Sequence, residues 1–450
     1  FLKNSSHNMK SFNHLPKTFK ASFYLLLICF LTSSTVIAQL SRTESKIIAK
    51  AQAYDQESID FLEKMVNINS GTLNLAGVKE VGMLLGEEYK KISFNTQWIE
   101  MPDEMNRAGH LFASTPERKK SKGKKLLLIG HLDTVFEADS PFQEFEVRDG
   151  VVYGPGANDM KGGNVVMLYA LKVLHDLNLL NKATITVAYT GDEESTGKPL
   201  NLSRKDLIEA AQRSDVALGF ENSTGFNNAT VARRGSSGWK VEVKGKRSHS
   251  SSIFREKTGA GAVFEMSRIL NEFYNDVRGE TYLSFNPGVL LGGTFVNFDG
   301  AQSKGDSFGK SNVVAQTAVV KGGLRFISED QKNRARDKMK EIVSNNLPQT
   351  SAKISFTDSY PSMGPTEENS LLLGRLNQVS LDMVQDAVVA YDPGKRGAAD
   401  ISFVAQYVAC LDGLGTMGSG AHTPNETVDL ETMNLLIQRT AVLIYRLINE

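Results

Sequence analysis

Apolar residues recur at helical spacing in the first part of the chain that follows its N-terminal segment. Between residues 43 and 89, for example, Ile59, Leu62 and Val66 lie three and four positions apart, which places them on one helix face. We therefore expect this part of the chain to be largely helical.

A second pattern follows, in which short apolar runs alternate with helical spacing. Residues 124–130 form an apolar run that ends in glycine, and residues 183–189 are rich in β-branched side chains, so both are predicted to be strands. Residues 163–177 between them have helical spacing, and residues 217–221 end a further predicted strand. Strands that alternate with helices predict an α/β domain with a mostly parallel sheet.

The pattern changes in the middle of the chain. Residues 238–245 alternate between polar and apolar side chains, which is typical of a half-exposed antiparallel strand. A helical stretch (259–276), a strand-like segment (312–326), a charged helix (329–346) and a short strand (353–356) follow. This order predicts an inserted β-α-β-β-α-β domain of the ferredoxin-like kind.

These patterns divide the chain into an N-terminal segment, an α/β domain and an insertion. We expect the α/β domain to comprise residues 39–233 and 359–450, and the inserted domain to comprise residues 234–358. Residues 1–38 are predicted to be a signal peptide with a few residues upstream of it.

The N-terminal segment has the composition of a cleaved signal peptide. Three lysines between residues 10 and 20 precede a nearly apolar run at residues 21–31, which is too short to span a bilayer comfortably. Residues 36–38 have the small or modest side chains that a signal peptidase accepts. We expect residues 9–38 to be removed, Gln39 to begin the mature chain, and the protein to be secreted or periplasmic. An uncleaved membrane anchor is the alternative.

Composition excludes several function classes. The 51 basic residues balance the 51 acidic ones, and no basic cluster alternates with aromatic residues, so we expect neither a nucleic acid nor a membrane as partner of the mature chain. Of the two cysteines, Cys29 lies in the apolar run, and only Cys410 would remain after cleavage. No disulfide can then form within one chain, and a metal site must use His, Asp and Glu.

Acids and a histidine stand at the ends of the predicted strands, where ligands bind in open parallel sheets. His131 and Asp133 follow the first strand directly, so His131 can bind a metal while Asp133 orients it. Glu193 and Glu194 follow the next strand and can divide metal binding and proton transfer between them. Glu221 ends a third strand. Each feature alone is also typical of an ordinary polar turn.

Two glycine-rich loops carry further candidates. Residues 153–163 are not a phosphate loop, because Lys161 is followed by glycine instead of serine or threonine, and they present Asp159 before a helix. Asp159 can also act only as a cap of that helix. Residues 418–426 carry His422, which is one of the few histidines in the mature chain.

Four motifs resemble, in order and approximate spacing, the aminoacylase and glutamate carboxypeptidase family of two-zinc metallopeptidases. They are the segments His131–Val135, Tyr153–Gly163, Gly191–Glu194 and Gly420–Glu426. The likeness extends over essentially the whole mature chain. It implies a zinc-exopeptidase-like catalytic α/β domain and an inserted lid domain through which two subunits usually form a homodimer.

The resemblance also implies two zinc ions per subunit, with cobalt or manganese as alternatives. Asp159 is similar to the carboxylate that bridges both ions. By the same likeness, His131 and Glu221 would complete one metal site. Glu194 and His422 would complete the other.

Further roles follow from the resemblance alone. Glu193 is similar to the general base, and Asp133 to the aspartate that orients the first histidine. His249, in a Ser-rich lid segment, resembles the histidine that reaches the partner subunit's active site and stabilises the oxyanion. The family also has a cis peptide bond after its bridging aspartate, so we expect Asp159–Met160 to be cis.

Substrate-binding residues transfer less completely. Asn312 and Arg325 resemble lid residues that bind a substrate carboxylate, and Gly397 belongs to a loop that offers it backbone N–H groups. Two positions differ from the family pattern, since Gly323 stands in place of an aspartate and Ala399 in place of serine or threonine.

The expected function is hydrolysis of an amide bond next to a free C-terminal carboxylate, in a small peptide and possibly before glutamate. An N-acyl-amino-acid deacylase or dipeptidase with the same metals is an alternative within enzymes, and a metal-free secreted binding protein is an alternative outside them. Lys395 and Arg396 either favour an acidic substrate side chain or are solvated surface charges. Residues 312–320 are a candidate edge strand that pairs across the dimer axis.

Overall fold

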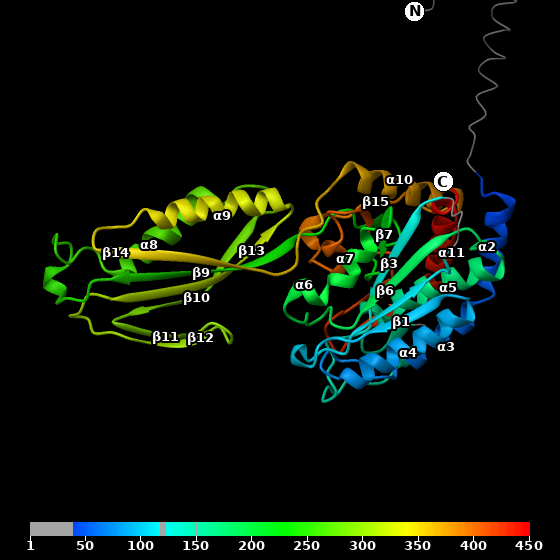
Figure 1. Ribbon diagram of the computed structural model, residues 1–450, viewed down its shortest axis with the longest axis horizontal. Helices are drawn as coiled ribbons and strands as arrows, with labels where there is room; N and C mark the ends of the chain where they lie inside the picture. The colour runs from blue at the N-terminus through cyan, green and yellow to red at the C-terminus, as the bar shows by residue number, and fades with distance from the viewer. Residues whose placement is uncertain (1–38, 118–122, 150) are drawn as a thin grey trace, which may run out of the picture. The chain divides into compact units, whose positions relative to one another are not determined.

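The computed structural model describes residues 39–117, 123–149 and 151–450 (Figure 1). The predicted signal peptide, residues 1–38, lies outside the described residues. Within the described ranges, no helix has both the length and the apolar character needed to cross a membrane.

A mixed six-stranded sheet forms the centre of the α/β domain, in the order β1-β2-β6-β3-β7-β16. β6, β3, β7 and β16 run parallel to one another, and β2 runs antiparallel to both of its neighbours. The predicted α/β class with a mostly parallel sheet is therefore confirmed. The strands are β1 (Asn95–Ile99), β2 (His110–Ser114), β3 (Lys125–His131), β6 (Thr184–Thr190), β7 (Val216–Gly219) and β16 (Ala409–Leu411).

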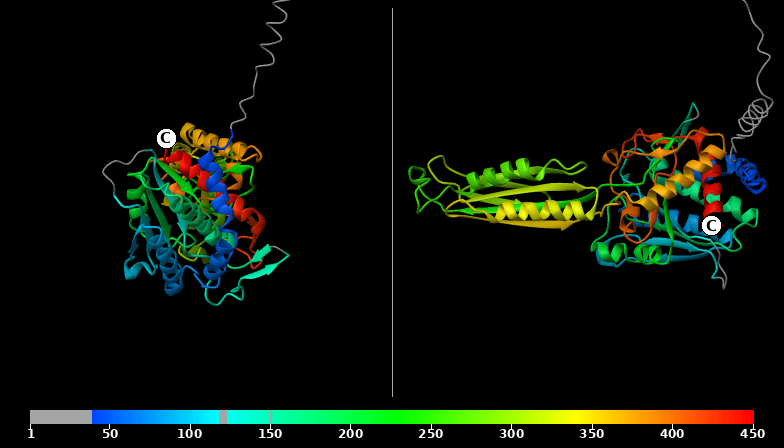
Figure 2. Two further views of the ribbon diagram at one scale, coloured as in Figure 1. Left: turned by 90° about the vertical axis from the view of Figure 1, so that its right-hand side faces the viewer. Right: turned by 90° about the horizontal axis from the view of Figure 1, so that it is seen from above.

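Helices pack around this sheet, and they confirm the helical spacing that the sequence shows before residue 90. The C-terminal helix α11 packs against α2 and α5, so segments from opposite ends of the described chain lie side by side (Figures 1 and 2). The helices are α2 (Arg42–Gln52), α3 (Asp55–Val66), α4 (Leu75–Lys91), α5 (Gly162–Asp176), α6 (Leu200–Ser203), α7 (Lys205–Ala211), α10 (Glu367–Asp382) and α11 (Leu430–Leu447).

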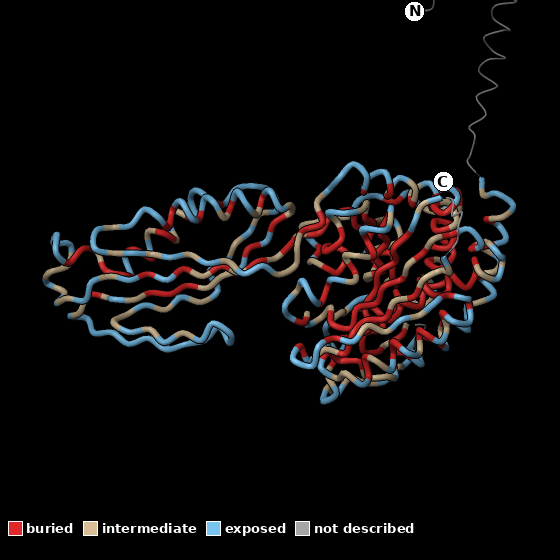
Figure 3. Tube along the Cα trace, viewed as in Figure 1, coloured by how far each residue is buried: buried red, intermediate tan, exposed pale blue. Residues whose placement is uncertain are grey.

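The central strands are buried on both faces because helices cover them (Figure 3). On one face, Leu127 and Ile129 of β3 form a core cluster with Leu207 and Ala211 of α7. A near-continuous apolar strand is typical of a parallel sheet covered on both sides. This packing fixes the ends of the strands, where the predicted site residues stand.

The inserted region is a four-stranded antiparallel sheet in the order β10-β13-β9-β14, with helices packed on one face. Its chain order, β9-α8-β10-β13-α9-β14, together with this strand order confirms the ferredoxin-like prediction. A hairpin is inserted between β10 and β13. The elements are β9 (Gly235–Gly245), α8 (Ala262–Glu272), β10 (Ser284–Gly293), β11 (Phe295–Asp299), β12 (Lys304–Phe308), β13 (Thr317–Phe326), α9 (Glu329–Ser344) and β14 (Thr350–Asp358).

The prediction of an edge strand over residues 312–320 is wrong. β13 begins only at Thr317 and lies inside the sheet, between β10 and β9. The edge strands are β10 and β14. β10 contains Pro287 at a break in register and several glycines, so its sequence does not have a strand pattern. Proline lacks a donor for the ladder and is therefore confined to edges and bulges.

Smaller strands complete the α/β domain. They form a four-stranded sheet, β17-β18-β5-β4, and a parallel pair, β15-β8. Their bounds are β4 (Glu146–Arg148), β5 (Val151–Tyr153), β8 (Asn228–Ala229), β15 (Val389–Ala390), β17 (Gly418–Ser419) and β18 (Thr427–Asp429).

Candidate active site

The carboxyl ends of three parallel strands bring predicted donors to one edge of the central sheet. His131 is the last residue of β3, Glu193 and Glu194 follow β6, and Glu221 follows β7. Because these strands are neighbours in the sheet, residues far apart in the sequence meet at this edge.

Asp159 comes from the glycine-rich loop that precedes α5. Gly156 has a φ of +68°, and a Cβ there would meet Thr134 Cγ2 at 2.2 Å, so the turn requires glycine. The buried Glu426 carboxylate accepts hydrogen bonds from the backbone N–H groups of Asn158 at 2.8 Å and Asp159 at 2.9 Å. The predicted cis bond between Asp159 and Met160 is confirmed.

The five predicted metal ligands converge around Asp159. His131 Nε2 lies 3.2 Å from Asp159 Oδ1 and 3.7 Å from Glu221 Oε1. On the other side, His422 Nε2 lies 3.2 Å from Asp159 Oδ2 and 3.2 Å from Glu194 Oε2. One oxygen of Asp159 thus faces each group, which is the arrangement a bridging carboxylate needs.

The donor set fits two divalent ions. Each group contains one imidazole nitrogen and two carboxylate oxygens within 4.8 Å of one another, and the two groups share Asp159. Two ligand atoms that each bind one tetrahedral zinc ion at about 2.0–2.2 Å lie roughly 3.3–3.6 Å apart, which is close to these separations. In addition, Glu194 Oε1 is buried and has no hydrogen-bond partner among the described residues, as expected for a ligand atom.

The acids and histidines of the cluster shift one another's pKa values. Burial alone would raise the pKa of Asp159, but hydrogen bonds from His131 and His422 lower it overall. Burial and the Asp159 charge raise the pKa of Glu221 to about 7. Hydrogen bonds to Asp159 and Glu194 raise the pKa of His422 to about 11. Crowded carboxylates of this kind are stabilised by bound cations.

Glu193 stands beside the cluster in a half-buried position. Burial, followed by the nearby Glu221 charge, raises the pKa of Glu193 well above its usual range. A carboxyl group with a raised pKa is suited to accept and return a proton near neutral pH. The Tyr360 hydroxyl donates to the Glu193 backbone carbonyl at 2.7 Å and so holds this turn from another segment of the chain.

Asp133 does more than the sequence predicts. Its carboxylate accepts hydrogen bonds from the backbone N–H of Glu193 at 2.9 Å and of Glu194 at 3.0 Å. The same carboxylate accepts from the Thr72 hydroxyl at 2.7 Å. His131 Nδ1 lies 3.0 Å from the Asp133 carbonyl oxygen but 3.5 Å from its carboxylate. Asp133 therefore orients His131 mainly through its backbone and fixes the Glu193–Glu194 turn through its side chain.

The predicted lid residues lie elsewhere. His249 is exposed and pairs through a β-bridge with Val313, next to Asn312, whose carbonyl accepts from the Ser250 N–H at 2.9 Å. Among the described residues, no hydrogen bond or ion pair connects His249 or Asn312 to the metal-ligand cluster. Arg325 is an exposed residue of β13.

Lys395 and Arg396, which the sequence leaves as either substrate-binding or surface charges, differ in burial. Lys395 is exposed, whereas Arg396 is buried, with its guanidinium bonded to the side chain and backbone of Asn222 at 2.9 and 3.2 Å. Asn222 directly follows Glu221, so Arg396 lies next to the metal-ligand cluster. Gly397 follows, and its carbonyl accepts from Arg233 Nη1 at 2.9 Å.

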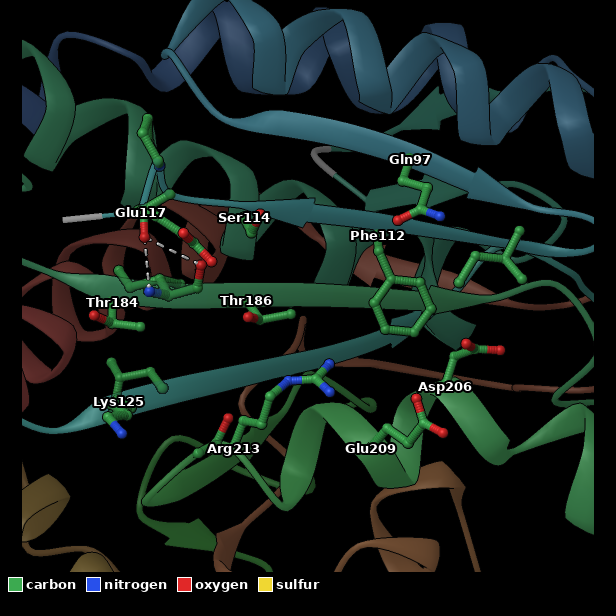
Figure 4. Close-up of a pocket in the computed structure, with 16 residues that line it drawn as sticks. Gln97, Phe112, Ser114, Glu117, Lys125, Thr184, Thr186, Asp206, Glu209 and Arg213 are labelled. Atoms are coloured by element: carbon green, nitrogen blue, oxygen red, sulfur yellow. Dashed lines mark hydrogen bonds between the residues drawn. The ribbon is translucent and has the colours of Figure 1, made fainter.

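A larger groove lies at the opposite ends of the same strands (Figure 4). It has a volume of about 920 Å³ and is lined by Lys125 and Thr184 at the starts of β3 and β6, together with Arg213 just after α7. The length of β3 puts its first residue roughly 20 Å from His131. The groove is therefore separate from the metal-ligand cluster.

Sequence reasoning missed several residues that support the cluster. Glu426 lies in a recognised motif, yet nothing in its spacing indicates that it bonds the backbone at Asp159. His110 is buried, with Nε2 2.8 Å from the Ser203 carbonyl oxygen and Nδ1 accepting from the Gly191 N–H at 3.2 Å. Such contacts depend on tertiary packing, and no local pattern carries them.

Comparison with protein-family models identifies the family of this chain. Residues 127–446 match the model described as peptidase family M20/M25/M40. The chain belongs to this family. This M20 peptidase is also 26% identical over 441 residues to carboxypeptidase G2 of Pseudomonas sp. (strain RS-16), covering 95% of this chain and 98% of that one. The predicted resemblance to the aminoacylase and glutamate carboxypeptidase family is thus confirmed.

The chain is also similar to a curated desuccinylase and to a solved peptidase structure. Succinyl-diaminopimelate desuccinylase of Blochmanniella floridana is 21% identical over 366 residues, which cover 78% of this chain and 90% of that one. The Bacillus subtilis YxeP protein, described as a dinuclear metal binding peptidase from the M20 family, shares the fold with a TM-score of 0.60 and 14% identity, covering 88% and 99% of the two chains. The protein is therefore a metal-dependent hydrolase of the M20 peptidase family.

Proposed function

We propose that this M20 peptidase is a secreted or periplasmic two-zinc carboxypeptidase that releases a C-terminal amino acid, with glutamate as the preferred residue. The observation that carries the proposal is the pair of ligand groups that share Asp159, with Glu193 beside them. His131 and Glu221 would hold one ion, and Glu194 and His422 the other.

When bound, the two ions would supply an activated water and polarise the scissile carbonyl. The protein's own contribution centres on Glu193. Its carboxylate would take the proton from the attacking water and give it to the leaving amine. Asp133 and Tyr360 hold the backbone of this turn through hydrogen bonds, so the carboxylate is positioned before substrate binds.

Guanidinium groups support a substrate with free carboxylates. Although Arg325 is exposed as a whole residue, partial desolvation of its guanidinium and the neighbouring Arg234 charge lower its pKa. Burial and the Arg233 charge lower the pKa of Arg396 to about 10, and no carboxylate among the described residues forms an ion pair with its guanidinium. Glutamate carries a second carboxylate that would balance this charge. Arg325, Asn312 and the Gly397 loop are proposed to bind the substrate.

A deacylase is the second candidate function. The similarity to a succinyl-diaminopimelate desuccinylase favours it, because that relative's name describes removal of an acyl group from an amine. Both reactions cleave an amide at the same kind of metal pair, so the substrate pocket decides between them.

We also propose a homodimer formed through the lid. Apolar side chains are exposed on and beside α8, at Phe254, Val263, Phe264 and Tyr274. Large exposed apolar patches mark interaction surfaces. In such a dimer His249 would reach the partner's active site, as the family resemblance implies.

The test is release of free amino acid from peptidyl-glutamate and N-acyl-glutamate substrates, compared with the same compounds ending in alanine, lysine or diaminopimelate. Metal analysis by mass spectrometry would accompany the assay. We expect glutamate release that stops with a chelator, and two zinc ions per chain. Preference for succinylated diaminopimelate would support the deacylase, and a chain that binds no metal would contradict both.

A further inference from the structure

A fully buried guanidinium joins two loops of the candidate active site. Arg204 lies between α6 and α7 and has 0% exposure. Its Nη1 donates to Asp192 Oδ1 at 2.5 Å, and its Nε donates to Asp400 Oδ1 at 2.8 Å. Asp192 directly precedes Glu193, and Asp400 closes the Gly397 loop. One side chain therefore spans the distance from the base to the proposed substrate loop.

The bridge is tightly restrained at its Asp192 end. Arg204 Nη2 also donates to the Asp192 carbonyl oxygen at 3.2 Å. The second oxygen of Asp192 accepts from the Ser203 hydroxyl at 2.7 Å and from the Gly197 N–H at 2.8 Å. Both oxygens of this carboxylate thus accept from donors in the segment that follows Glu194.

The Asp400 end is restrained in the same way. Asp400 Oδ2 accepts from the hydroxyl of Thr190, the last residue of β6. The guanidinium also lies over the ring of Phe403, 5.3 Å from its centroid. Because the guanidinium is planar and its donors are fixed relative to one another, the two carboxylates cannot move independently.

Simple packing does not require such an arrangement. Arg439 is equally buried, at 1% exposure, yet it stacks on Phe226, and its only hydrogen bond within the described part of the chain is to a backbone carbonyl. Buried ion pairs are also weak devices for stability, since apolar residues of similar volume often replace them without loss. What distinguishes Arg204 is where its two carboxylates stand.

We propose that Arg204 is a positioning residue that holds Glu193 in register with the Gly397–Asp400 loop. The inference rests on the proposed function, because it assigns the base to Glu193 and the substrate carboxylate to that loop. A small displacement of either loop would separate the base from the bond that it serves.

The test replaces Arg204 by lysine, which keeps the charge but puts one ammonium nitrogen in place of the three guanidinium nitrogens that donate to Asp192 and Asp400 in a fixed plane. Arg439→Lys is the matched control, since it makes the same change at an equally buried arginine. The readouts are kcat and KM on peptidyl-glutamate, zinc content, and the folded fraction from circular dichroism. We expect kcat per folded, zinc-loaded molecule to fall about 100-fold in Arg204→Lys and at most about threefold in the control.

A second variant covers the case in which Arg204→Lys does not fold. Asp192→Asn, Arg204→Met and Asp400→Asn together leave no buried charge without a partner. This neutral variant is expected to melt near the wild-type temperature and still to have low kcat.

Three results would overturn the inference. Wild-type kcat in folded Arg204→Lys, or in the neutral variant, would show that the bridge does not position the base. Loss of zinc from Arg204→Lys at saturating zinc would place the effect on Glu194 instead. A wild-type protein that binds zinc and cleaves none of the substrates would reject the proposed function itself, and the inference with it.

Discussion

The two ends of the central sheet present opposite kinds of surface. At the carboxyl ends, His131, Glu194 and Glu221 converge with Asp159, and the cavity that His131 and Glu221 line there has a volume of only about 10 Å³. At the amino ends lies the groove of about 920 Å³, where Arg213 and Lys125 stand among hydroxyl side chains (Figure 4). Size alone would select the groove as the active site.

Chemistry selects the other end. Around the groove, within the described part of the chain, no three His, Cys, Asp or Glu donors come within metal-binding distance of one another. Glu209 pairs with Lys205 one helical turn away, as surface charges often do. A small site whose donors are held by buried hydrogen bonds is better prepared for catalysis than a larger one with separate side chains.

Metal removal is expected to have the largest effect on kcat, because among the described residues only the carboxyl-end cluster brings metal-binding donors together. Because bound ions supply several kcal/mol of transition-state stabilisation, a chelator is expected to reduce kcat at least about 10⁴-fold, and zinc should restore it. The assay is amino acid release before and after dialysis. Activity that survives in a chain shown to be free of metal would remove the carboxyl-end cluster from the reaction.

Glu193→Gln should have the next largest effect. The amide keeps the shape of the side chain but cannot take a proton, so we expect kcat to fall about 1000-fold while two metal ions stay bound. Glu209→Gln makes the same change at the groove and should leave kcat unaltered. An equal loss in both variants, or an empty metal site in Glu193→Gln, would contradict the assignment of the base.

Much of the fold follows from local sequence patterns. β3 and β6 are visible as apolar, β-branched runs, and α5 has clear helical spacing, so their order along the chain indicates an α/β domain. β10 is not visible, because Pro287 and its glycines suit a bulged edge strand and resemble a loop. Because β10 is not predicted, the sequence assigns the edge position to the segment that contains β13.

The site also contains residues that the sequence predicts and residues that it does not. Its ligands are recognisable because strand ends and a family motif mark them in the sequence. Arg204, His110 and Glu426 are not recognisable, since their roles depend on partners such as Asp400, which is far away along the chain. Long-range hydrogen bonds leave no periodic signal, and only packing reveals them.

Asp133→Asn is expected to have an intermediate effect on kcat or zinc affinity. The asparagine amide would present N–H donors toward the backbone N–H groups of Glu193 and Glu194, which need acceptors. We expect kcat or zinc affinity to fall about 10–100-fold, as for other groups that orient ligands. Kinetics and a zinc titration measure the two effects. Asp206→Asn, at the groove, is the control, and a loss confined to that variant would reverse the ranking of the two ends.

The smallest effect is expected from the groove itself. Arg213→Ala removes its most prominent cation without touching the metal-ligand cluster, and Figure 4 shows this side chain reaching from the α7 side toward the sheet. We expect kcat/KM on peptidyl-glutamate to change less than about twofold and the unfolding free energy by no more than about 0.5 kcal/mol. Kinetics and thermal melts test both values. A tenfold loss of kcat/KM at an unchanged melting temperature would mean that the amino ends of the strands contribute to catalysis, because stability could not explain it.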